Sequence, residues 1–108
     1  MEQSEFLEKN VFQGLKKLND GFEGEAVPFF SESDFEIVLD RAEYFGIGIY
    51  GIEPWLNGEL YDVITNENLK KKATDPRWYK KAFQTFKLRQ PGLSYSATYK
   101  VSGKLLAR

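Results

Sequence analysis

Two acidic residues, Glu53 and Asp62, offer the most suggestive chemistry in this chain. They lie on two β-rich segments, residues 47–55 and 59–65, with an Asn-Gly pair between them that predicts a two-residue turn. In the register that this turn implies, the two carboxylates face each other across neighbouring strands. Like charges placed opposite one another destabilise a sheet by up to about 1 kcal/mol, so a functional reason for them is worth seeking.

Three kinds of site would explain facing carboxylates. A pair in which one carboxylate keeps the other protonated could carry out acid–base catalysis. A hard cation such as Mg²⁺ or Ca²⁺ could bind, although two carboxylates are few for a dedicated cage. An acidic recognition surface could receive a basic protein partner, with an aromatic side chain as its anchor. The binding residues of this last hypothesis are Glu53, Trp55, Tyr61 and Asp62.

A structural interpretation of the same residues competes with all three. Either a bulge at Pro54 shifts the register, or lysines from the basic half of the chain neutralise both acids. We therefore assign no catalytic residue and no metal ligand, and we expect no cofactor.

Two absences narrow the possible chemistry further. The 108 residues include no His and no Cys. A Ser-His-Asp or Cys-His catalytic site cannot be assembled from such a chain, and neither can a zinc site of the usual type. Any catalysis would have to use carboxylates, Tyr, Lys or Ser.

The segment Gly46–Gly51 matches the dinucleotide-binding pattern G-x-G-x-x-G. That motif works only where a strand precedes the glycines and a helix N-terminus follows to receive the pyrophosphate. Here a helix is expected before the glycines and a strand after them. We therefore interpret Gly46 as a helix cap, and Gly48 and Gly51 as places where a helix or an aromatic ring packs closely on the strand.

The C-terminal part of the chain is basic. Its exposed cations form a candidate patch that could neutralise phosphates: Lys70, Lys71, Lys72, Arg77, Lys80, Lys81 and Lys87. This patch supports an alternative function, a nucleic-acid-binding module that uses the basic helix 75–89. The competing interpretation is a solvated helix face that attracts the acidic part of the same chain.

The overall net charge of −1 conceals this division. Residues 1–65 contain four Lys/Arg and fourteen Asp/Glu, a net charge of −10, whereas residues 66–108 contain eleven and two, a net charge of +9. Such asymmetry indicates either charged partners or two halves that neutralise each other.

Local patterns predict the elements that would position these residues. Apolar residues at helical spacing predict a helix over residues 4–19 capped by Ser4. Ser31 and Gly46 delimit a second helix, and Asp75-Pro76 begins a third that ends before Gln90. Clean alternation over residues 93–101 predicts a strand with one wet face, and residues 104–108 are expected to be a further strand or a tail. The loop residues Val27, Phe29 and Phe30 are expected to fold back onto the core.

These elements predict a single α+β domain spanning residues 1–108. Their order is ααββαβ, and it favours a small antiparallel sheet of three or four strands with helices packed on one face. A right-handed crossover through the third helix would place the last strand beside the first, which gives the strand order 2-1-3.

The segment FSESDFEIVLDRAEYFGIGIYGIEPWLNGELYDV, with DPRWYKKAF downstream, resembles small uncharacterised bacterial proteins of the immunity type, which accompany toxins in interbacterial competition. The resemblance covers about residues 29–86. It implies a non-enzymatic protein that binds one cognate toxin through a charged surface, and it carries over no residue role.

We therefore expect a small bacterial protein that acts by protein–protein recognition, with a basic partner and possible immunity-type neutralisation of a toxin. A nucleic-acid-binding module and a carboxylate-dependent enzyme at Glu53 and Asp62 are the alternatives. The N-terminal sequence is acidic and lacks an apolar segment, and no run of about 18 apolar residues occurs. We therefore expect a cytoplasmic protein with no membrane contact.

Overall fold

The computed structural model describes residues 1–18 and 28–107. The helices are α1 (Gln3–Asn10), α2 (Glu32–Phe45), α3 (Pro76–Arg89) and α4 (Gly103–Leu106). The strands are β1 (Gly48–Leu56), β2 (Glu59–Leu60), β3 (Ile64–Thr65) and β4 (Ser94–Lys100). The radius of gyration is 13.3 Å, close to the value of about 13 Å expected for one domain of 100 residues.

Helices α2 and α3 begin where the sequence predicts. The Ser31 hydroxyl accepts a hydrogen bond from the backbone N–H of Asp34 (3.3 Å), and the Asp75 carboxylate accepts one from the N–H of Arg77 (3.0 Å). Each cap satisfies a backbone donor that the first helical turn leaves unpaired. Both helices bury one apolar face against the sheet.

Helix α1 is much shorter than predicted. It ends at Asn10, and the helix expected over residues 4–19 is therefore wrong in its C-terminal half. Its N-cap is Glu2, which makes no side-chain capping bond, rather than Ser4. The chain instead turns through Gly14 at φ +80°, a conformation that glycine adopts without the steric penalty other residues incur.

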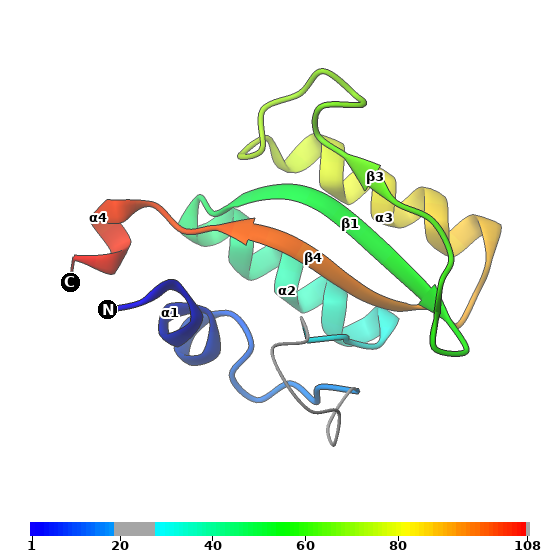
Figure 1. Ribbon diagram of the computed structural model, residues 1–108, viewed down its shortest axis with the longest axis horizontal. Helices are drawn as coiled ribbons and strands as arrows, with labels where there is room; N and C mark the ends of the chain where they lie inside the picture. The colour runs from blue at the N-terminus through cyan, green and yellow to red at the C-terminus, as the bar shows by residue number, and fades with distance from the viewer. Residues whose placement is uncertain (19–27, 108) are drawn as a thin grey trace.

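The sheet is antiparallel throughout, and β1 lies at its centre (Figure 1). One edge of β1 pairs with β2 and β3, and the other pairs with β4. The predicted order 2-1-3 is confirmed, with the second predicted strand now divided into β2 and β3. The C-terminal residues form the short helix α4 rather than a strand.

The free edge of β4 is closed by two segments from the N-terminal part of the chain. Phe30 exchanges two backbone hydrogen bonds with Tyr95, each 2.8 Å long. Farther along, the Gln3 side chain donates to the carbonyl of Tyr99 (3.1 Å) and accepts from the N–H of Val101 (2.8 Å). The amide thus imitates a neighbouring strand, which protects an edge that could otherwise pair with another chain.

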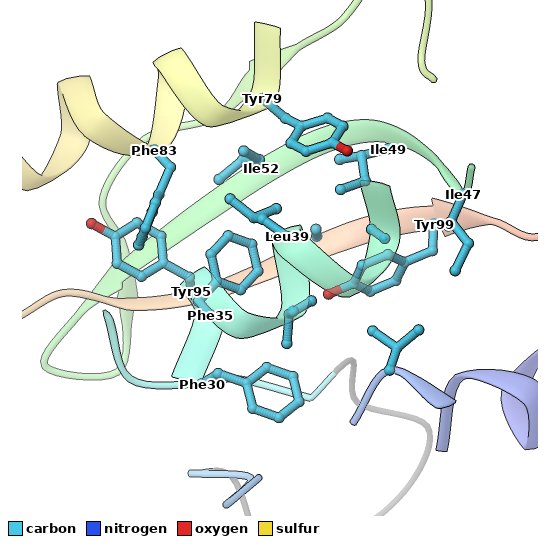
Figure 2. Packing of buried hydrophobic residues seen from close by; sticks show 14 of the residues in the cluster. Phe30, Phe35, Leu39, Ile47, Ile49, Ile52, Tyr79, Phe83, Tyr95 and Tyr99 are labelled. Atoms are coloured by element: carbon cyan, nitrogen blue, oxygen red, sulfur yellow. The ribbon is translucent and has the colours of Figure 1, made fainter. Parts of the chain in front are cut away.

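Helices α2 and α3 cover one face of the sheet, and in Figure 1 they lie behind β1 and β4. Figure 2 shows the aromatic side chains that fill this layer. The ring of Phe35 lies 5.2 Å from that of Tyr95 and 5.5 Å from that of Phe83, so that α2, α3 and β4 meet at one residue. In the part of the chain that the structure describes, no helix lies over the opposite face.

Of the three glycines, only Gly46 has the predicted role, that of a helix cap. The predicted packing of a helix or an aromatic ring on Gly48 and Gly51 is wrong, and Gly51 faces Ile64 and Thr65 of β3. Gly46 ends α2 at φ +67° and donates its N–H back to the carbonyls of Ala42 and Glu43. Gly48 lies where a Cβ atom would approach the Cβ of Ala73 to 3.3 Å, so the close neighbour is the connection before α3 and not a helix or a ring. A nucleotide-binding interpretation therefore has no helix N-terminus after the glycines to support it.

Replacing Gly46 by alanine is expected to lower the free energy of unfolding by about 1–2 kcal/mol, because a side chain disfavours positive φ. No atom lies within 4 Å of the added Cβ, so backbone strain is the whole effect. Gly103→Ala is the matched control, since Gly103 begins a helix without positive φ and also has open space around it. Urea denaturation measures the free energy of unfolding of both variants. Equal losses of stability in the two would contradict the role of Gly46 as a helix cap with positive φ.

Candidate functional site

The structure separates the two candidate carboxylates. The turn forms as predicted, with Trp55 opposite Leu60, but farther along Ile52 pairs with Ile64 instead of Val63. One extra residue between β2 and β3 therefore shifts the register. Glu53 lies opposite Ser96 of β4. The predicted facing of Glu53 and Asp62 is wrong, and a shared-proton pair loses its geometric basis.

Asp62 is already neutralised within the chain. It accepts hydrogen bonds from the backbone N–H of Val63 (2.7 Å) and from the Arg89 guanidinium (3.0 Å). The Val63 bond and then the Arg89 bond hold the pKa of the Asp62 carboxyl below its usual value. The Asp62 carboxyl is therefore ionised near neutral pH and is already paired with a cation of the same chain, Arg89.

Tyr61 lies on the same side of the sheet as Asp62. The Arg89 guanidinium lies 5.6 Å from the centre of the Tyr61 ring and 5.3 Å from that of Phe86. Because Arg89 ends α3, these contacts place Tyr61 and Asp62 beside the helical layer. The competing structural interpretation placed a bulge at Pro54 of β1. The extra residue lies instead on the partner strand, between β2 and β3, where Val63 and Arg89 bind the Asp62 carboxylate.

Glu53 and Trp55 lie on the other face of the sheet. Their neighbours on β4, Ser96 and Thr98, lie on the face opposite Tyr95, Ala97 and Tyr99. The sequence predicted that this face is wet, which is wrong at Ser96, because Ser96 is buried. Thr98 donates its hydroxyl to the Glu53 carboxylate (3.3 Å), and the Trp55 indole donates to the Ser96 hydroxyl (3.0 Å). The four predicted binding residues therefore form two separate pairs.

An aromatic pair lies next to the Glu53 carboxylate. Phe29 stacks on Trp55 with ring centres 4.8 Å apart. The sequence predicted that Val27, Phe29 and Phe30 fold onto the core. This is confirmed for Phe30, which is fully buried, but not for Phe29, and Val27 lies outside the described residues. Since Phe29 and Phe30 are adjacent in an extended segment, their side chains point to opposite faces of the sheet. Ser96, beneath Trp55, is completely buried.

Glu53 differs from Asp62 in having no cationic partner. Across residues 1–18 and 28–107, the structure pairs Glu53 with no Lys or Arg. Its side chain remains partly exposed beside Trp55, which is also partly exposed. The candidate site is therefore a single carboxylate next to an aromatic stack, on the face that the described helices leave open. We call these residues, Phe29, Glu53, Trp55, Ser96 and Thr98, the open-face site.

The predicted basic patch is divided among different contacts. Lys80 bridges Asp40 (3.1 Å) and Glu43 of α2, and the bond to Glu43 contributes most to raising the pKa of Lys80. Arg77 is held by the Asp75 carboxylate through two side-chain hydrogen bonds, of 2.9 and 3.0 Å. The acidic α2 and the basic α3 thus neutralise part of each other's charge through Lys80. This agrees with the interpretation of the charge asymmetry in which the two halves of the chain neutralise each other.

The remaining patch residues differ in their surroundings. The Lys87 ammonium lies 4.6 Å from the centre of the Phe83 ring, and Lys70 and Lys72 are exposed. Lys71 and Lys81 line a groove beside α3. The basic patch is therefore not a continuous row of free cations along one helix face.

The described residues contain no group of three or more acidic, His or Cys side chains placed to hold a metal ion. Among the described helices, none has the length and apolar character needed to cross a membrane. The chain matches no protein-family model, no curated protein and no solved structure.

Proposed function

We propose that this protein acts by protein–protein recognition, binding a basic segment of a partner on the open-face site. The observation that carries the proposal is the Glu53 carboxylate, which forms no ion pair with any described residue and lies beside the Trp55–Phe29 stack. A Lys or Arg side chain from a partner would pair with the carboxylate and lie against the indole ring.

The surroundings of the site favour recognition of this kind. Trp55 is held by its bond to Ser96, so little side-chain freedom remains to be lost on binding. Tryptophan and arginine are the residues that most often dominate binding energy at protein interfaces. The resemblance of residues 29–86 to immunity-type domains supports a toxin as the partner.

An arginine-rich peptide tests the proposal without knowledge of the natural partner. In a titration followed by NMR, we expect shifts at Glu53, Trp55 and Thr98, and about a fivefold loss of affinity in Glu53→Gln. Glu59→Gln is the matched control, because Glu59 is an exposed carboxylate on the same hairpin. Equal losses in the two variants, or shifts confined to other surfaces, would contradict the proposal.

Toxin neutralisation has a separate test. If a toxin gene adjoins the gene for this chain, co-expression is expected to restore growth of cells that produce the toxin, and Glu53→Lys is expected to abolish the rescue. Growth that stays inhibited with the wild-type protein would remove toxin neutralisation, while leaving the peptide result to decide on recognition.

A further inference from the structure

A groove lies on the helical side of the sheet, away from the open-face site. One wall is the face of α3 that carries Arg77, Trp78, Lys81, Ala82 and Thr85, and the other consists of Ile64, Leu69 and Lys71. Figure 1 shows β3 and the following connection running beside α3. The volume of about 390 Å³ falls within the range of about 300–1,000 Å³ that is typical of small-molecule sites.

The wall opposite α3 is held in place by its own hydrogen bonds. The backbone N–H of Lys71 donates to the carbonyl of Asn66 (3.0 Å), and the Asn66 side chain donates to the carbonyl of Lys71 (3.0 Å). The hydroxyl of Thr65 donates to Asn68 (2.8 Å). Lys71 is thus carried by a closed turn, and the groove exists before any ligand binds.

The lining combines apolar and cationic side chains. Ile64, Leu69, Trp78 and Ala82 supply the apolar surface, and Leu69 is 40% exposed although it is a leucine. Lys71, Arg77 and Lys81 supply the charge. Asp75 already compensates Arg77, whereas in the described chain no carboxylate forms an ion pair with Lys71 or Lys81.

We propose that this groove binds a small amphipathic anion, with an apolar body over Leu69 and Trp78 and a singly charged head group between Lys71 and Lys81. The two lysines offer point charges rather than a free guanidinium fork, because Arg77 is engaged with Asp75. This arrangement suits one carboxylate better than the spaced phosphates of a nucleic acid.

Octanoate is a suitable probe, and its neutral analogue octan-1-ol is the control for charge. In Trp55→Phe, Trp78 is the one remaining tryptophan and reports on the groove. We expect saturable octanoate binding that changes the Trp78 fluorescence, and weaker binding of octan-1-ol. The double variant Lys71→Gln/Lys81→Gln is expected to lose about three- to tenfold in octanoate affinity, the combined effect of two exposed charge pairs.

Lys70→Gln/Lys72→Gln is the matched control, since it removes the same amount of charge from the two neighbours of Lys71, which do not line the groove. Circular dichroism establishes that both double variants are folded, as expected for exposed side chains. Equal octanoate affinity in the two variants would overturn the proposal, as would equal binding of octanoate and octan-1-ol or no saturable binding. Tighter binding of a single-stranded oligonucleotide than of octanoate, lost in both variants, would identify the basic patch as a nucleic-acid surface instead.

Discussion

Replacing Phe35 by alanine is expected to lower the free energy of unfolding by about 3–5 kcal/mol. Phe35 is fully buried, and its ring contacts those of Phe83 and Tyr95. Its removal leaves a cavity where α2, α3 and β4 meet, and the rings around it are held by separate elements that cannot all move inward. Because small domains are stable by only about 5–15 kcal/mol, this is a large share of the total.

Chemical denaturation followed by circular dichroism measures this effect. Tyr44→Ala is the matched control on the same helix, because Tyr44 is 83% exposed and its loss is expected to change stability by less than about 0.5 kcal/mol. If Phe35→Ala does not fold, Phe35→Leu provides a milder test with the same sign. A loss below about 1 kcal/mol in Phe35→Ala would show that this contact is not the centre of the core.

Alkaline pH is expected to unfold the protein cooperatively above pH 10. Burial raises the pKa of Tyr79 to about 12 and raises the pKa values of Tyr95 and Tyr99 as well. The nearby carboxylates Glu43, Glu32 and Glu53, respectively, act in the same direction. The folded state therefore retains three protons that the unfolded chain releases near pH 10.

The sign of the effect follows from linkage. Below pH 10 both states bind these protons and the stability is complete, whereas above pH 10 the unfolded state binds fewer and stability falls as pH rises through the folded pKa values. Each tyrosine contributes a slope of at most about 1.4 kcal/mol per pH unit. Three such slopes together exhaust the stability of a small domain within a few pH units.

Tyrosinate absorbance and circular dichroism, recorded together against pH, test this expectation. The buried tyrosines Tyr79, Tyr95 and Tyr99 are expected to ionise only with the loss of structure. Tyr79→Phe is expected to make the pH dependence shallower without an initial loss of stability, because the Tyr79 hydroxyl has no hydrogen-bond partner in the structure. Ionisation of Tyr79, Tyr95 and Tyr99 near pH 10 with the fold intact would contradict the expected alkaline unfolding.

The sequence predicts some residues of the open-face site and of the groove, but not how each set comes together. Glu53 and Trp55 could be predicted as a pair because they are two residues apart on one strand, and such residues share a face. Phe29 could not be added to them, since nothing in the local pattern distinguishes it from Phe30. Lys71 and Lys81 were predicted as members of a basic patch, but their convergence on one groove depends on how the turn after β3 docks beside α3.

The strand register around Asp62 is the clearest feature that could not be predicted from the sequence. The turn and the pairing of Trp55 with Leu60 follow from an Asn-Gly dipeptide, which acts over two residues. The register beyond it depends on an extra residue near Asp62, whose carboxylate is bound by Arg89, 27 residues farther along the chain. The cost of facing carboxylates, which suggested function, is avoided by this shift.

The sequence by itself determined the elements whose signals lie within a few residues: the caps of α2 and α3, the buried face of α3, and the alternation of β4. These follow from backbone hydrogen bonding and the periods of helix and strand, which neighbouring residues satisfy. The tertiary structure alone decided which charges are neutralised and which remain available. Coulombic pairing depends on distance in space, and only folding brings Asp62 to Arg89 and Lys80 to α2. In the described chain, Glu53, Lys71 and Lys81 form no ion pair.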